Sequence, residues 1–396
     1  MDFDFDLYSR DTAQDPWPAI KAMQDAGPVL HNVRTGAYMV TTDKLARAVL
    51  TDTKRFTIEG TAVTIRFGRE AFFGIDDKAS HDKLRAIWMG AFTRNAVEAL
   101  RPMITQLADE MIDPVQERLR AGEVVDLEAE LCRSLPAYVI AHMMGVPMSY
   151  RDDVVRWSDA LGAASVLPAN ADKQTHPAWL AAYKARDEIG EYLGEAIAHR
   201  RKNPGGTDLI SQIVHSQHNL PDNVIISNSR QMLYAGNETT AKWLGHIVVA
   251  LSERPDVRAE VIADPKLMPQ ALEEVMRWRP VVMASVRLAQ PGGVEIEGVH
   301  IPEGKTIMPL VGCANRDPTR YEDPDTLNIH RKFQTNLGFG FGMHSCLGVT
   351  LARLEAQIVI ERLLARIPDY DVAGEVIYNA FALRGPKVLP IALQKH

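Results

Sequence analysis

One cysteine near the end of the chain lies in a setting that suits metal binding. Cys346 falls within residues 337–348, a stretch with four glycines, and precedes an apolar segment with helical spacing at 349–367. The free N–H groups and the positive dipole end at the start of a helix favour a thiolate there. A lone cysteine excludes a structural zinc site and a four-cysteine cluster, so the pattern predicts a single-thiolate metal site. The alternative is a buried structural cysteine beside a glycine turn.

The residues around this cysteine carry a family resemblance. Phe339, Gly342, Cys346 and Gly348 follow the spacing F-x-x-G-x-x-x-C-x-G, which resembles the haem-ligand signature of the cytochromes P-450. The resemblance implies a haem b cofactor (iron protoporphyrin IX) with Cys346 as the iron ligand. A thiolate in that position pushes electron density onto iron and favours cleavage of the O–O bond.

A second motif interrupts a long helical pattern at residues 222–252. Glycine, an acid and two threonines are poor choices for the centre of a buried helix, and such a break indicates function. The alternative is a kinked helix with satisfied threonines. The letters AGNETT resemble the oxygen-activation motif A-G-x-[DE]-T-[TS] of the same family. The resemblance implies that Ala235 and Gly236 lie at the haem and O2, and that Thr239 and Glu238 relay protons.

Four cationic residues match positions that bind haem propionates in the resembled family. His81 and Arg85 are spaced i and i+4 and share a helix face, although a solvated polar stripe would look the same. Arg287 stands in an R-x-A pattern, for which an exposed strand arginine is the alternative, and His344 precedes the cysteine by two residues. The resemblance implies charge-assisted pairs between these cations and the propionates.

A third group of residues is expected to be structural. Glu274 and Arg277 form the E-x-x-R pattern of the family's core helix, which is uninformative alone because such pairs are common on helix surfaces. With Arg331 at the family's spacing, the resemblance implies a buried ion-pair network.

The elements that must position these residues are mostly helical. We expect a mainly α protein with a small β region at residues 29–41 and 286–310, that is, the cytochrome P-450 fold as a single domain over residues 1–396. Helical periodicity and end signals predict helices over residues 12–27, 43–51, 81–92, 100–121, 127–144, 179–201, 222–252, 271–278 and 349–367.

Composition narrows the class of protein. The net charge of −7 argues against nucleic acid as a partner. The N-terminal residues lack a basic flank with an apolar run and a membrane-length apolar span, so we expect neither signal peptide nor membrane anchor. Three cysteines are too few for a disulfide framework, which is typical of a reducing compartment. We therefore expect a cytoplasmic protein, and a monomer.

The resemblance implies a haem-thiolate monooxygenase that inserts one atom of O2 into a C–H bond, giving hydroxylation or oxidative O-demethylation. No strand–GxGxxG–helix pattern indicates a built-in flavin or nicotinamide domain. Electrons are therefore expected from a separate ferredoxin and ferredoxin reductase, with NAD(P)H used only through these partners. A peroxide-driven haem peroxygenase, against which Glu238 and Thr239 argue, and a non-catalytic haem-binding protein are the alternatives.

The substrate is expected to be a small, largely apolar molecule. The irregular stretch 56–80 is expected to roof its pocket, as in the resembled family. The residues that family mapping places on the pocket wall are Gln231, Tyr234, Ala235, Met283 and Leu383. The same mapping places Lys83, Arg94 and Arg353 on the face beneath Cys346, where an acidic ferredoxin is expected to dock.

Overall fold

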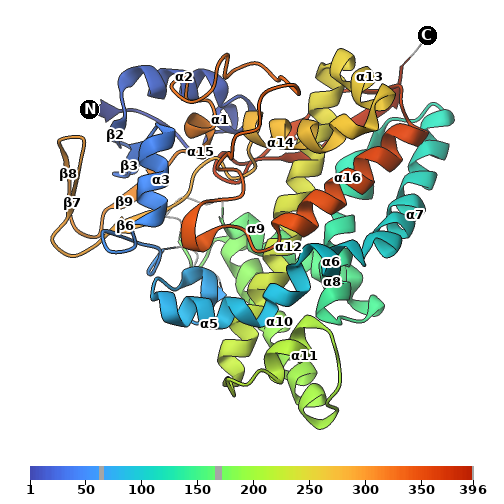
Figure 1. Cartoon of the computed structure of the whole chain (residues 1–396), viewed down its shortest axis with the longest axis horizontal. Coiled ribbons are helices and arrows are strands. Elements are labelled where there is room, and N and C mark those ends of the chain that lie inside the picture. Colours follow the sequence, from blue (N-terminus) through green and yellow to red (C-terminus); the bar gives the residue numbers. More distant parts are fainter. Residues whose placement is uncertain (62–66, 166–171, 395–396) are drawn as a thin grey trace.

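One long helix, α12 (Asp222–Glu253), organises the helical part of the molecule (Figure 1). The computed structural model describes residues 1–61, 67–165 and 172–394. Helices α8, α9, α10 and α16 all pack against α12, and most of the central side chains of α12 are buried. The α-helices other than α12 are α1 (Arg10–Gln14), α2 (Trp17–Ala26), α3 (Asp43–Thr51), α5 (Lys78–Met89), α6 (Arg94–Glu98), α7 (Arg101–Arg120), α8 (Ser134–Met144), α9 (Arg151–Ser165), α10 (Pro177–Lys202), α11 (Leu209–Val214), α13 (Pro255–Ala263), α14 (Met268–Trp278), α15 (Val311–Ala314) and α16 (Val349–Arg366).

Short helical turns connect several of these elements. The 3-10 turns are η1 (Phe72–Gly74), η2 (Gly90–Phe92), η4 (Met148–Tyr150), η5 (Pro265–Leu267) and η6 (Gly342–His344). The turn η3 (Glu128–Cys132) is a π-helix that packs against α12 just before α8 begins.

The largest sheet lies with α2 and α3 at the end of the molecule that holds the N-terminus (Figure 1). In spatial order its strands are β1 (Asp2–Phe3), β2 (Val29–Asn32), β3 (Tyr38–Val40), β9 (Thr306–Pro309), β6 (Arg287–Ala289) and β4 (Phe56–Thr57). Strands β3 and β9 are parallel, with Tyr38 opposite Ile307, and β6 is antiparallel to β9, with Arg287 opposite the same residue. The two β-rich segments predicted from the sequence therefore meet in one sheet.

Three small sheets complete the β structure. Their strands are β10 (Tyr370–Val372), β13 (Pro390–Leu393) and β5 (Val125–Asp126) in the first, β11 (Ile377–Tyr378) and β12 (Pro386–Val388) in the second, and β7 (Val294–Ile296) and β8 (Val299–Ile301) in the third. The predicted fold class, mainly α with a small β region, is confirmed.

Several predicted boundaries are wrong for identifiable reasons. The helix predicted at 12–27 is two helices, α1 and α2, because the chain is extended at Asp15 ahead of Pro16. The helix predicted from residue 81 begins earlier, at Lys78, because the Asp77 carboxylate accepts a hydrogen bond from the Ser80 N–H and caps it. The helix predicted at 127–144 is divided into η3 and α8. Within the described ranges, no helix combines the length and apolar character of a membrane span.

Candidate functional site

Cys346 closes a tight loop directly before α16. Its N–H donates to the carbonyl of Phe339 at 2.9 Å, and Gly348 is the N-cap residue of the helix. Gly342 adopts φ +74°, and a Cβ there would lie 2.9 Å from Cγ2 of Thr51. Both the left-handed backbone and the close approach favour glycine. The predicted haem-ligand loop thus presents one thiol at the start of a long helix.

The thiol of Cys346 is accessible, whereas the other two cysteines of the chain are fully buried. Surrounding protein raises the pKa of the Cys346 thiol, while the Gly348 N–H and the charges of Arg85 and Arg353 act in the opposite direction. A thiol that is accessible yet enclosed by protein suits a bound metal, because the metal takes the place of the proton.

The predicted propionate-binding residues come together from three elements. Arg85 of α5 donates to the carbonyl of Ser345 at 2.9 Å. The rings of His81 (α5) and His344 (η6) have their centroids 5.1 Å apart. Arg287 is buried at the start of β6. Arg85, His81 and His344 thus lie together at the Cys346 loop.

Of these side chains, the two arginines have no anionic partner among the described residues, whereas each histidine ring meets a carboxylate on one nitrogen: His81 Nδ1 lies 2.9 Å from Asp82 Oδ1 and His344 Nε2 lies 3.4 Å from Asp76 Oδ1. In the described part of the chain, Arg287 forms no ion pair and donates only to the Val286 carbonyl at 2.8 Å and to Ser285 Oγ at 3.4 Å. Burial lowers its pKa to about 10. His81 Nε2 and His344 Nδ1 are buried without a hydrogen-bond partner there. Because such groups are costly when left alone, the site fits a cofactor that carries carboxylates.

The centre of α12 is left uncovered at one residue. Ala235 is exposed although its neighbours along the helix are mostly buried. Thr239, one turn further on, is half-buried and donates its hydroxyl hydrogen to the Ala235 carbonyl at 3.1 Å. Gly236 points elsewhere: a Cβ there would lie 2.7 Å from Cγ1 of Ile140, so glycine lets α8 approach α12 closely. The helix is continuous rather than broken at this motif.

The Glu238 side chain points away from α12 in a different direction from the Thr239 hydroxyl. Glu238 Oε1 lies 2.8 Å from Lys242 Nζ, one turn along α12. The same carboxylate lies against Gly162 of α9. Adjacent helical residues diverge, so Glu238 and Thr239 are neighbours in sequence without sharing a face.

The structure brings together the three residues expected to form a core network. Arg277 pairs bidentately with Glu274, Nη2 to Oε1 at 2.7 Å and Nε to Oε2 at 2.8 Å. Arg331 Nε reaches the same carboxylate at 3.1 Å. Both arginines also donate to the carbonyl of Thr326, so the network fixes the loop that leads towards Cys346.

The predicted pocket residues do not all lie on one wall. Met283 is fully buried in a cluster with Ile20 and Phe381 beside the sheet, so it does not share the exposure of Ala235. Leu383 is partly exposed and forms a β-bridge with Val282.

The two polar residues of the predicted pocket are buried against the loop that precedes α5. Gln231 Oε1 accepts a hydrogen bond from the Phe73 N–H at 3.3 Å, and the Tyr234 ring packs 5.3 Å from that of Phe67. Both side chains thus support the part of the predicted 56–80 loop that is described; residues 62–66 of that loop lie outside the described residues.

Sequence reasoning missed several residues that shape the site. Asn228 accepts from the Phe72 N–H at 3.0 Å and donates to the Glu70 carbonyl at 2.8 Å, anchoring the same loop. Asp76 Oδ1 lies 3.4 Å from His344 Nε2. Burial alone would raise the pKa of Asp76, but hydrogen bonds, first among them that from His344, hold it below its ordinary value. The spacing of Asn228 and Gln231, two polar residues at i and i+3 in the first half of α12, is the sequence feature that could have indicated this anchoring.

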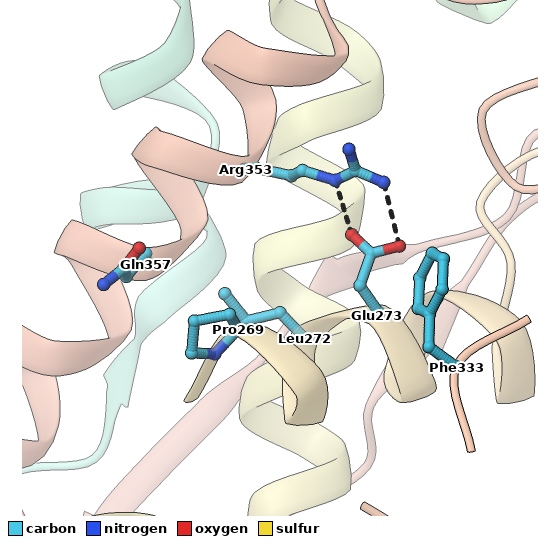
Figure 2. A pocket seen from close by; sticks show the side chains of 6 residues that line it. All are labelled: Pro269, Leu272, Glu273, Phe333, Arg353 and Gln357. Atoms are coloured by element: carbon cyan, nitrogen blue, oxygen red, sulfur yellow. Dashed lines mark hydrogen bonds and ion pairs between the residues drawn. The ribbon is translucent and has the colours of Figure 1, made fainter. Parts of the chain in front are cut away.

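The expected docking face contains an ion pair that the sequence did not predict. Arg353 is held by Glu273 at 2.6 Å and 3.0 Å, as Figure 2 shows, so it is not a free cation. Lys83 and Arg94 are exposed. The residues lining the adjacent surface pocket of about 200 Å³ are Pro269, Leu272, Glu273, Phe333, Arg353 and Gln357 (Figure 2).

Comparison with known proteins agrees with this geometry. The family model for cytochrome P-450 matches residues 21–367. Cytochrome P-450 107B1 from Saccharopolyspora erythraea is 37% identical over 301 residues, covering 75% of this chain and 70% of that protein. The cytochrome P-450 monooxygenase PikC from Streptomyces venezuelae is 33% identical, with 98% and 93% covered. The mycinamicin IV hydroxylase/epoxidase of Micromonospora griseorubida is 32% identical, with 80% and 78% covered.

Solved structures give the same result. That of CYP109E1 from Bacillus megaterium in complex with testosterone has a TM-score of 0.87 at 28% identity, with 98% of this chain and 100% of that chain covered. The chain therefore belongs to the cytochrome P-450 family and is a monooxygenase of the bacterial type. Membership implies haem and O2, and the buried Arg287 and the unpartnered nitrogens His81 Nε2 and His344 Nδ1 fit that cofactor.

Proposed function

We propose that the protein inserts one atom of O2 into a C–H bond of a small, largely apolar organic molecule, by hydroxylation or oxidative O-demethylation. The observation that carries this proposal is the combination of one accessible thiol, a buried Arg287 that has no anionic partner among the described residues, and the exposed Ala235 one turn before Thr239 on α12. Bound haem would supply the activation of O2 at iron ligated by Cys346.

The protein's own residues would orient the cofactor and deliver protons. His81, Arg85, Arg287 and His344 would bind the propionates, which would give each arginine an anion and the second nitrogen of each histidine a hydrogen-bond partner. The Thr239 hydroxyl would hold a proton at the exposed face of α12, with Glu238 as its source of replacement protons.

The substrate would lie against the exposed Ala235. A methyl side chain at that position favours apolar contact, and the loop anchored by Asn228 and Gln231 would cover the substrate. One relative is a mycinamicin hydroxylase/epoxidase and one structural neighbour holds testosterone, which supports a ring-bearing, weakly polar substrate.

Electrons would come from a separate ferredoxin and ferredoxin reductase in the cytoplasm, acting on a monomeric protein. Exposed Lys83 and Arg94 near the Cys346 loop would attract an acidic ferredoxin. NAD(P)H would then be consumed only through these partners.

Turnover with defined electron donors tests the proposal. Macrolides, steroids and aromatic ethers are first screened for a change in haem spin state, and the strongest binder is incubated with NADH, ferredoxin and its reductase. We expect a product that carries one oxygen from 18O2, or its demethylated equivalent. Oxidation with hydrogen peroxide alone, and none with the partners, would instead identify a peroxygenase. Haem binding without oxidation under either condition would identify a binding protein.

A further inference from the structure

A lysine is buried beside the acid of α12. Lys242 and Glu238 lie at i+4 and i, with side chains 11% and 14% exposed and Nζ 2.8 Å from Oε1. Burial opposes the charged form of Lys242, but attraction to Glu238 and their hydrogen bond hold its pKa above the ordinary value. A buried ammonium without an anion would be strongly unfavourable, so the two residues depend on one another.

Two glycines from different elements confine this ion pair. Gly385, in the turn before β12, passes so close to Lys242 that a Cβ on the glycine would overlap the lysine stem. Gly162 of α9 lies against the partner, where a Cβ would be 3.1 Å from Glu238 Oε1. The ammonium and the carboxylate are therefore held in place from both sides of α12.

A second carboxylate shares the field of the lysine. Glu128 belongs to η3, which packs against α12, and it is only 7% exposed. Burial raises the pKa of Glu128 to about 7. The positive charges of Lys387 in β12, Arg133 at the end of η3 and Lys242 lower this pKa, in decreasing order, and the negative charge of Asp159 in α9 raises it. Glu128 thus gains or loses its proton near neutral pH.

Other titratable groups lie around Glu128. The thiol of Cys132, on the same turn, is fully buried, and burial raises its pKa well above the ordinary value. Asp126 Oδ1 accepts a hydrogen bond from the Glu128 N–H at 3.2 Å, and Arg133 and Asp159 are paired with each other at 3.0 Å. Among the groups named, Glu128 is the one whose pKa burial brings to about 7.

We propose that Lys242 is a positioning residue for proton delivery to Thr239, and that the charge of Glu128 sets how tightly Lys242 holds Glu238. The inference rests on the proposed monooxygenase function. With Glu128 neutral, the ammonium serves Glu238 alone and keeps it ionised. With Glu128 ionised, two carboxylates share one ammonium, and Glu238 accepts a proton more readily. Glu238 takes that proton from solvent and returns it by way of water to the Thr239 hydroxyl, which has given up its own proton to reduced O2; the protons balance and no further electron moves.

Infrared spectra of the resting ferric protein test the link without turnover. We expect a protonated carboxyl band that disappears as pH rises through about 7 and is absent in Glu128→Gln; it is distinguished in this way from the band of the buried Glu355, whose pKa burial raises well above its ordinary value. In Lys242→Met we expect an additional protonated carboxyl band, which Glu238→Gln removes, because a buried carboxylate without its cation is neutralised. Lys242→Arg should resemble the wild type. No additional band in Lys242→Met would overturn the positioning role.

Turnover then tests the consequence, with the strongest binder of the spin-state screen as substrate. We expect hydrogen peroxide released per NADH in Glu128→Gln to match the wild type at pH 6 and to exceed it several-fold at pH 8. In a Lys242→Met background, Glu128→Gln should change nothing further, because the link is already broken. An identical pH profile in wild type and Glu128→Gln would overturn the proposal, even if Lys242→Met failed to fold.

The failure of the proposed function has a different signature. Wild type that oxidises no substrate with ferredoxin at any pH would contradict the monooxygenase reaction, while the infrared bands would still decide whether Lys242 links the two carboxylates.

Discussion

At the scale of single residues, the Cys346 thiol is chemically distinct because it alone of the three is accessible. We predict that the reduced, carbon monoxide-bound protein shows the red-shifted Soret band of thiolate ligation and that Cys346→Ala abolishes it. Cys313→Ala is the matched control, since that thiol is fully buried, and it should keep the band. A wild-type band in Cys346→Ala would show that a residue other than Cys346 ligates the iron.

The buried cations give a second prediction at this scale. Arg85→Ala combined with Arg287→Ala should release haem on dilution or mild heating, because each charge-assisted hydrogen bond contributes on the order of 1–3 kcal/mol. Haem transfer to apomyoglobin measures the rate. The control is Arg118→Ala, an exposed arginine in surface ion pairs, which should leave the rate unchanged. Equal rates in the double variant and the wild type would show that these cations do not bind the cofactor.

A short local motif is enough to select Cys346 and Thr239 as candidates, and the structure leaves both accessible, Cys346 exposed and Thr239 half-buried. Contacts between distant segments could not be predicted in this way. The burial of Met283 beside the sheet depends on how such segments pack, and the confinement of the Glu238–Lys242 pair depends on Gly162 of α9 and on Gly385, about 140 residues away from Lys242.

At the scale of elements, α14 and α16 are joined on the expected docking face by Glu273 and Arg353. We predict that Glu273→Gln, which frees Arg353, raises the rate of reduction by an acidic ferredoxin a few-fold at low ionic strength, and that salt removes the gain. Stopped-flow reduction measures this. Glu295→Gln, the same charge change on β7 in the distant sheet region (Figure 1), is the control and should have little effect. Reduction rates that do not change with ionic strength would show that ferredoxin docks on another surface.

At the scale of the whole molecule, one buried acid should shape stability against pH. Glu128 has a pKa of about 7 when folded and an ordinary value of 4.5, so the folded state binds this proton more tightly. The contribution of this bound proton to the free energy of unfolding is fully present below pH 4.5 and is lost as the pH rises through about 7. The difference between these two pKa values corresponds to on the order of 3 kcal/mol of unfolding free energy.

We therefore predict that the free energy of unfolding of the wild type falls more between pH 4.5 and 7.5 than that of Glu128→Gln, by about that amount. Urea unfolding at several pH values measures the difference. Glu130→Gln, two residues along but exposed, should follow the wild type. Parallel curves for wild type and Glu128→Gln would mean that Glu128 ionises normally in the folded protein.

The anchoring of the loop before α5 has a consequence for redesign. Asn228 and Gln231 accept hydrogen bonds from the N–H groups of Phe72 and Phe73, so the loop before α5 is anchored to the same helix that carries Ala235 and Thr239. A loop transplanted from a relative would lose these two hydrogen bonds unless its own backbone N–H groups lay within reach of the Asn228 and Gln231 side chains. Attempts to change the range of accepted molecules should therefore exchange the loop and these two helix positions as one unit.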